Sequence, residues 1–208
     1  MSTPAAAEPS PFLLPPAPEA LEVERERVRL RPFVEADLEA MAVYRGDAEV
    51  CRFLPFEPQS PDDIRRRIGH LFGRTSLHGE NAGVVLVIEG VSDAEVIGDL
   101  VLFHVDTAAG SAEIGWVVSP AASGRGLATE AVRALIDTAF SVYGLRRLVA
   151  RIDAENTRSA ALAERLGMRR EAHLVENEWF KGRWSDELDY AVLAREWRLD
   201  DAGGDAGE

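Results

Sequence analysis

A turn with two closely spaced glycines lies between an apolar stretch that predicts a strand and the most regular helical pattern in the sequence. Gly124 and Gly126 allow backbone conformations and a close approach of a ligand that a side chain would block. The helix that follows offers backbone N–H groups without partners and the positive end of its dipole. Arg125 adds one positive charge to the turn. We interpret this arrangement as a pyrophosphate site, in preference to a glycine-containing loop without a ligand.

The same turn fits neither of two common nucleotide-binding motifs. The phosphate-binding loop of nucleoside triphosphatases needs a lysine directly after its glycines, whereas the only lysine of this chain is Lys181. The dinucleotide motif needs a third small residue where Thr129 stands. It also needs an acidic residue about 20 positions further on, where Arg146 and Arg147 stand. The sequence therefore disfavours both classes.

The elements that must position the turn alternate between strands and helices. Apolar spacing predicts strands over 28–33, 84–88, 96–103, 112–118, 148–152, 171–180 and 183–192. Helices are predicted over 38–44, from Ser60 onward, over 128–143, and from Asn156 to Leu166 with Gly167 ending the last. This order predicts an α/β domain built on one mixed sheet.

Several of these segments resemble the GNAT family of acetyl-CoA-dependent N-acyltransferases. The segments are Ala112–Pro120, Gly124–Ala131, Asn156–Ser159 and Leu166–Met168. The closing segment Gly182–Trp197 is similar to the branch typified by the RimJ and RimL ribosomal-protein N-terminal acetyltransferases. The resemblance extends from about Arg27 to Trp197. It implies a GNAT-like, mostly antiparallel sheet with splayed central parallel strands, flanked by helices, in an acetyltransferase domain over residues 21–199.

The resemblance also implies which residues bind acetyl-CoA. They are Val117, Val118, Ser123, Gly124, Arg125, Gly126, Leu127, Ala128, Thr129 and Asn156. The strand before the turn would bond the pantetheine arm, and a backbone N–H near Val117 or Val118 would stabilise the oxyanion. Asn156 either meets the pantetheine or only caps its helix. Ser123 stands where the family has glutamine or arginine, which predicts weaker binding of acetyl-CoA and not its loss.

By the same resemblance, two residues are candidates for catalysis. Ser159 matches the serine proposed to protonate the departing CoA thiolate, although it could serve only as a helix residue that bonds its cap. Glu178 matches the glutamate proposed as general base, although it could be a solvated strand charge. Glu113 occupies a strand position where other branches of the family carry a base, and we favour a structural role for it.

The leading hypothesis is therefore acetyl transfer to a primary amine by direct attack through a tetrahedral intermediate. One acceptor that the resemblance suggests is the N-terminal α-amino group of a protein. The first alternative is an acetyltransferase for a small amine such as an aminoglycoside or a polyamine. The second is a catalytically weak CoA-binding sensor, which Ser123 favours.

Composition limits the remaining classes. The chain of 208 residues has a net charge of −13, which argues against nucleic acid and anionic membranes as partners. Six acidic residues lie in a Pro/Ala-rich lead-in, 1–20, and an acidic tail, 200–208, both expected to be disordered. The single cysteine, Cys51, excludes an internal disulfide and fits the cytoplasm. We expect no metal and a monomer or homodimer.

Overall fold

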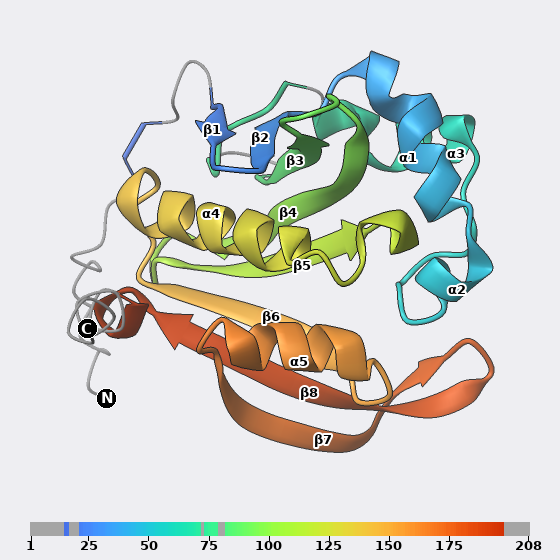
Figure 1. The fold of residues 1–208 in the computed structure, drawn as a ribbon. Helices are drawn as coiled ribbons and strands as arrows, with labels where there is room; N and C mark the ends of the chain where they lie inside the picture. Colours follow the sequence, from blue (N-terminus) through green and yellow to red (C-terminus); the bar gives the residue numbers. More distant parts are fainter. Residues whose placement is uncertain (1–14, 17–20, 72, 79–81, 198–208) are drawn as a thin grey trace, which may run out of the picture.

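The computed structural model describes residues 15–16, 21–71, 73–78 and 82–197 (Figure 1). The terminal segments predicted to be disordered therefore lie outside the described residues, apart from Pro15 and Pro16. The predicted domain lies within the described part of the chain, except for short gaps and its last two residues.

One mixed sheet of eight strands runs through the molecule in the order β1-β2-β3-β4-β5-β6-β8-β7. The strands are β1 Val23–Glu24, β2 Val28–Pro32, β3 Val84–Gly90, β4 Val96–Asp106, β5 Ser111–Val118, β6 Arg147–Asp153, β7 Arg169–Phe180 and β8 Arg183–Leu193. Neighbouring strands are antiparallel except for β5 and β6, which are parallel. This confirms the predicted mixed, mostly antiparallel sheet, to which the structure adds the short edge strand β1.

Helices cover both faces of the sheet. They are α1 Leu38–Arg45, α2 Ala48–Cys51, α3 Pro61–Ile68, α4 Leu127–Ser141 and α5 Thr157–Arg165, with single 3-10 turns at Glu35–Asp37, Gly69–Leu71 and Pro120–Ala122. α4 and α5 lie on the same side of the sheet (Figure 1). Leu86 and Ile88 of β3 share their core with α4 and α5, whereas Val85 and Val87 share theirs with α1 and α3. The unbroken apolar run of β3 is thus a strand buried on both faces.

Local signals in the sequence account for the ends of the helices that frame the site. Ser60 caps α3 through a reciprocal pair of bonds with Asp63, and Pro61 follows at the first helical position. Asn156 caps α5 by accepting the Ser159 N–H, at 3.1 Å. Gly167 follows α5 with a φ of 74°, the left-handed conformation that favours glycine after a helix.

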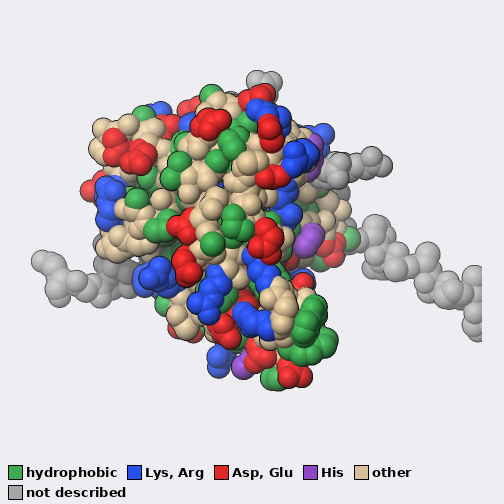
Figure 2. Space-filling model, turned by 90° about the vertical axis from the view of Figure 1, so that its right-hand side faces the viewer, with side chains coloured by type: hydrophobic (Ala, Val, Ile, Leu, Met, Phe, Trp, Pro, Cys, Tyr) green, Lys and Arg blue, Asp and Glu red, His purple; other side chains and the backbone are tan. Residues whose placement is uncertain are grey.

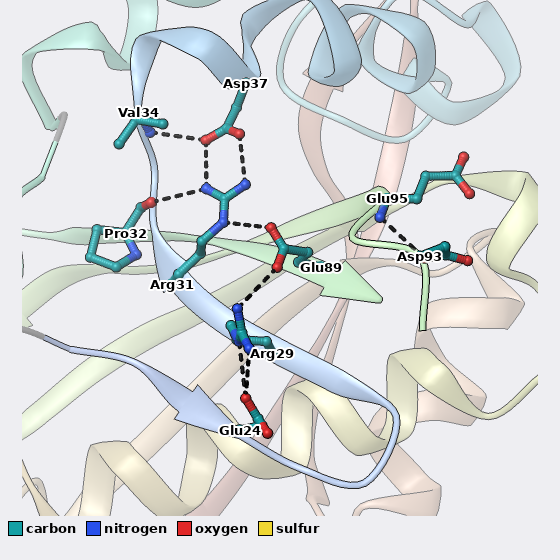
Figure 3. Close-up of polar contacts among 9 residues, drawn as sticks. All are labelled: Glu24, Arg29, Arg31, Pro32, Val34, Asp37, Glu89, Asp93 and Glu95. Atoms are coloured by element: carbon teal, nitrogen blue, oxygen red, sulfur yellow. Dashed lines mark hydrogen bonds and ion pairs between the residues drawn. The ribbon is translucent and has the colours of Figure 1, made fainter. Parts of the chain in front are cut away.

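A chain of ion pairs secures the β1–β2–β3 edge of the sheet (Figure 3). Arg31 of β2 forms a two-pronged contact with Asp37, at 2.8 and 2.9 Å, and a contact of 2.8 Å with Glu89. Arg29 continues the chain from Glu89 to Glu24. The hydrogen bond to Asp37 raises the pKa of the Arg31 guanidinium, although partial burial of that group opposes the shift. These ion pairs tie the turn Glu35–Asp37, which directly precedes α1, to the sheet.

Candidate functional site

The parallel strands β5 and β6 pair only where they begin. Their register covers three pairs, the last of which is Glu113 with Val149. β5 continues to Val118 and β6 to Asp153, and the two strands diverge toward these ends (Figure 1). β4 pairs with β5 as far as Val118 on the other edge. The edge of β5 beyond Glu113 therefore faces a gap in the sheet, which confirms the predicted splay.

The glycine turn joins the end of β5 to the start of α4. Gly124 and Gly126 have φ values of 74° and 77°, which side chains other than glycine rarely adopt. A Cβ atom added at Gly124 would meet no protein atom within 4 Å, so the space beside this glycine is open. Arg27 holds the turn from behind: its Nη1 donates to the Arg125 carbonyl at 2.8 Å, and its Nε donates to Glu130 at 2.7 Å. The turn is therefore fixed and open, as a pyrophosphate site requires.

Cations lie close to this turn. Arg165 of α5 donates to the Thr129 hydroxyl at 3.3 Å. Arg125 and Leu127 line a small cavity of about 210 Å³ beside the turn between β3 and β4. A negatively charged protein thus presents positive side chains around the start of α4, where the helix dipole also favours an anion.

Replacing Ser123 with arginine is expected to tighten acetyl-CoA binding about tenfold, because a guanidinium bonds phosphate more strongly than a hydroxyl. Ser123 is exposed, directly before the turn. Calorimetry at two salt concentrations would measure the gain, which should shrink as salt rises. The matched control is Ser141→Arg, which adds the same charge at the opposite end of α4. Equal affinities of Ser123→Arg and the wild type would contradict the placement of phosphate at this turn.

A larger cavity, of about 510 Å³, opens from the gap toward the segment after α2, toward α3 and toward the β7–β8 hairpin. It brings together four of the predicted site residues: Val117, Asn156, Ser159 and Glu178. Val118 and the residues of the glycine turn are not among those that line this cavity. The predicted site residues therefore fall into two groups, one in the glycine turn and one in the larger cavity, and β5 connects the two.

Ser159 is oriented by two contacts. Its N–H bonds the Asn156 cap, and its Oγ accepts a hydrogen bond from Trp116 Nε1 of β5 at 3.2 Å. The second contact bridges β5 and α5. Since Oγ accepts from Trp116, its own proton is available to donate into the cavity.

Glu178 and Glu113 differ in their partners, although both line the cavity. Glu113 lies 3.0 Å from His104 Nδ1 and 3.8 Å from Arg151 Nε. Glu178 is exposed, and its carboxylate forms no hydrogen bond or ion pair with any residue that the structure describes. Its carboxylate is thus the freer of the two to accept a proton from a ligand.

Among the other carboxylates that line the same cavity is Glu187 of β8, which was not predicted from the sequence. Partial burial raises its pKa, and the nearby carboxylates of Asp189, Glu113 and Glu178 add to the shift, while Arg151 opposes it. Only the register of β8 against β6, which pairs Glu187 with Asp153, places it beside the gap. The alternation of polar and apolar residues along the hairpin does not by itself show that Glu187 lies beside this gap.

Replacing Glu187 with glutamine is expected to stabilise the fold at pH 8, by about 0.5 kcal/mol because solvent screens much of the charge. Since the folded-state pKa is raised, the carboxylate costs stability above the ordinary glutamate pKa, and this cost grows until the pH passes the folded-state value. Below the ordinary glutamate pKa, Glu187 is protonated in both the folded and the unfolded state, so the stability gained by Glu187→Gln should vanish near pH 4. Urea unfolding at the two pH values measures it. Glu171→Gln is a control of opposite sign, because Arg147 and Arg169 lower the pKa of Glu171 to about 2.

A fully buried polar cluster lies under the cavity and was also missed. Asp99 of β4 accepts hydrogen bonds from Arg45 at 2.6 and 3.0 Å and from the Tyr44 hydroxyl at 2.8 Å. The Arg45 side chain is 4% exposed and that of Asp99 1%. Asp99 thereby fixes the end of α1 against the sheet at the point where the cavity begins.

The hairpin is fastened across the cavity by the single lysine of the chain. Lys181, in the β7–β8 turn, donates to the backbone carbonyls of Cys51 and Phe56 at 2.7 and 2.8 Å. It also lies 3.6 Å from Glu57. The segment after α2 and the hairpin therefore form a continuous wall around the cavity. Cys51 is buried in this wall, where it behaves as a small apolar residue.

Two further features of the described residues concern metals and membranes. No three histidine, cysteine, aspartate or glutamate side chains in this part of the chain are grouped so that they could hold a metal ion. None of its helices combines the length and the apolar character that crossing a membrane would require.

Comparison with known proteins agrees with this geometry. Residues 27–169 match the family model described as the acetyltransferase (GNAT) domain. An uncharacterized N-acetyltransferase of Bacillus licheniformis, p20, is 31% identical over 83% of this chain and 96% of its own length. The spermidine N(1)-acetyltransferase of Escherichia coli K12 is 24% identical over 82% of this chain and 88% of its own.

A solved structure shares the whole architecture. The crystal structure of a probable GNAT-family acetyltransferase from Chromobacterium violaceum superposes with a TM-score of 0.77 at 30% identity, covering 95% of this chain and 97% of that one. The splayed strands, the open glycine turn and these matches lead to one conclusion. The chain belongs to the GNAT family, and it is an acetyl-CoA-dependent N-acetyltransferase.

Proposed function

We propose that this enzyme acetylates a primary amine in the larger cavity, and that its acceptor is the N-terminal α-amino group of a peptide or protein. The observation that carries the proposal is the cavity itself, which joins the free edge of β5 to Ser159 and Glu178. The similarity of Gly182–Trp197 to the RimJ and RimL branch supports the choice of an α-amino acceptor.

Acetyl-CoA would bind along β5. The turn from Ser123 to Thr129 would hold the pyrophosphate through its backbone N–H groups and Arg125. The free edge of β5 at Val117 and Val118 would bond the pantetheine arm, with Asn156 beside it. A backbone N–H of that edge would then face the thioester oxygen and stabilise the charge that develops there.

Two proton transfers accompany the new C–N bond. An α-ammonium group has a pKa of about 7.7–8.0, well below that of lysine at about 10.4, so a modest base suffices to deprotonate it. Glu178 accepts this proton, directly or through a water molecule. As the C–S bond breaks, the Ser159 hydroxyl donates a proton to the thiolate. Glu113 is less suited to the first step, because His104 and Arg151 already engage it.

Two alternative functions also use acetyl-CoA, but one has a different acceptor and the other has no acetyl transfer. A small amine, such as an aminoglycoside or a polyamine, would use the same proton path. A CoA-binding sensor would bind acetyl-CoA and transfer nothing, and the serine at position 123 favours this reading.

The proposal is tested by the release of CoA thiol from acetyl-CoA with three acceptors. They are a short peptide with a free α-amino group, spermidine and an aminoglycoside, each with mass spectrometry of the product. Acetylation of the peptide at its α-amino group supports the proposal. Turnover of only a small amine supports the first alternative, and tight binding of acetyl-CoA without turnover of any acceptor supports the sensor.

A further inference from the structure

An arginine without a carboxylate partner lines the larger cavity. Arg67, on α3, points its guanidinium at the Phe56 ring, with 5.0 Å from Cζ to the ring centroid. Arg45 lies at the same distance from the same ring. Arg45 is paired with Asp99, whereas Arg67 forms no ion pair with any residue in the described part of the chain. The cavity thus contains one guanidinium whose charge is unmatched.

Arg67 is exposed, and the part of its side chain that lines the cavity is partly desolvated. Partial desolvation lowers its pKa, and the neighbouring Arg45 lowers it further. Asp99 accepts two bonds from Arg45 and one from Tyr44, and its carboxylate is directed at these two residues rather than at Arg67. An anionic group of a ligand would give Arg67 the partner that it lacks, because a guanidinium is suited to hold a carboxylate through two parallel bonds.

Carboxylates line the cavity on more than one side, with Asp99, Glu113 and Asp153 on β4, β5 and β6, and Glu178, Asp186 and Glu187 on the β7–β8 hairpin. Glu178 of β7 and Glu187 of β8 come from the hairpin, while Arg67 comes from the α3 side. Apolar side chains complete the lining on the α2 and α3 side: Phe53, Leu54, Phe56, Ile68 and Leu71. Figure 2 views the molecule from the side of α2 and the hairpin, where acidic and basic side chains stand close together. The lining therefore offers negative groups for an amine, a positive group for an anion, and an apolar surface.

We propose that the acceptor carries a carboxylate in addition to the amine that is acetylated, and that Arg67 binds this carboxylate. The inference rests on the proposed function and specifies the chemical class of its acceptor. A free amino acid supplies both groups, and so does a peptide with an acidic side chain near its N-terminus. A polyamine would bring a second cation toward Arg67 and is disfavoured, although the relative from Escherichia coli is named for spermidine.

Three acceptors of equal length test the proposal: 6-aminohexanoate, hexylamine and 1,6-diaminohexane, which differ only at the far end. Wild-type enzyme should show a kcat/KM for 6-aminohexanoate about tenfold to a hundredfold above that for hexylamine, and the lowest value for the diamine. Arg67→Gln should reduce this preference to less than about threefold, and Arg67→Lys should retain part of it. The matched control is Arg66→Gln, the next residue of α3, which pairs with Asp63 and does not line the cavity.

A second pair of acceptors separates the two sources of the carboxylate. Short amidated peptides with aspartate or asparagine at the second position differ by one charge. If the enzyme prefers the aspartate peptide and this preference depends on Arg67, the natural carboxylate belongs to a peptide. If the Arg67-dependent preference is seen only for 6-aminohexanoate over hexylamine, the carboxylate belongs to a small acceptor. Equal kcat/KM values for the acidic and neutral members of both sets, or a preference that survives Arg67→Gln, would overturn the proposal.

Binding of a product analogue keeps the test independent of catalysis. The enzyme should bind 6-acetamidohexanoate detectably in calorimetry. It should bind the neutral N-hexylacetamide at least about tenfold more weakly, and Arg67→Gln should remove this difference in affinity. Equal binding of the two overturns the inference, while acetylation of the α-amino group of both amidated peptides would leave the proposed function standing. Failure to bind acetyl-CoA would instead refute the proposed function.

Discussion

Replacing Glu178 with glutamine is expected to lower kcat about 10²- to 10⁴-fold, the range over which a positioned general base contributes. The glutamine keeps the size of the side chain and removes its capacity to take the ammonium proton. Glu178 is exposed and no described residue engages its carboxylate, so the fold should lose little stability. The affinity for acetyl-CoA should stay within a factor of two, because Glu178 does not belong to the glycine turn. Steady-state kinetics and calorimetry measure the two quantities separately.

The control for this variant is Glu176→Gln, two residues earlier on the same strand. Glu176 is exposed and does not line the cavity, so its kcat should match the wild type. The loss in Glu178→Gln should be smallest at high pH, where the α-amine is already neutral and needs no base. Full turnover by Glu178→Gln at neutral pH would refute the role of Glu178 and direct attention to Glu187 or Glu113.

Replacing Asp99 with asparagine is expected to cost about 3–5 kcal/mol of the free energy of unfolding, because it leaves the buried Arg45 without a counter-ion. Both side chains are almost wholly inaccessible, and three hydrogen bonds converge on the carboxylate. The loss is a large part of the stability of a typical domain. Urea unfolding monitored by circular dichroism measures it, with the slope of the transition as a check on two-state behaviour.

The double variant Arg45→Met/Asp99→Leu distinguishes the cost of an unpaired buried charge from the cost of altered packing. It removes both charges together, so it should be more stable than Asp99→Asn, even if it does not reach the wild type. Tyr44 then loses its acceptor, and Tyr44→Phe in the same background should recover part of the remaining loss. A stability of Asp99→Asn within about 1 kcal/mol of the wild type would contradict this account.

The sequence predicted those parts of the fold that local rules determine. The order of strands and helices, the Ser60 cap, the Asn156 cap and the glycine turn all follow from spacing and backbone preferences. The splay of β5 and β6 came from the family resemblance, and the register that ends at Glu113 confirms it. Short elements such as β1 and α2 were missed because two to four residues carry too little periodicity.

The charged lining of the cavity could not be predicted for a different reason. Arg65, Arg66 and Arg67 are adjacent and alike in sequence, yet only Arg67 lines the cavity. Which of the three does so depends on how α3 packs against the sheet. Likewise the hairpin register shifts between Leu174 and Glu178, so alternation along β7 does not reveal which acids face the gap. Such placements depend on contacts between distant segments rather than on local spacing.

Binding of acetyl-CoA, measured by calorimetry with CoA and NADH as comparisons, tests the central claim most directly. In the proposed complex the turn from Ser123 to Thr129 would hold the pyrophosphate, and β5 would lead the thioester into the cavity. We predict micromolar binding of acetyl-CoA, on the order of −8 kcal/mol, and similar binding of CoA. NADH should not bind, because the turn lacks the dinucleotide motif. Failure of acetyl-CoA to bind, or equal binding of NADH, would contradict the account.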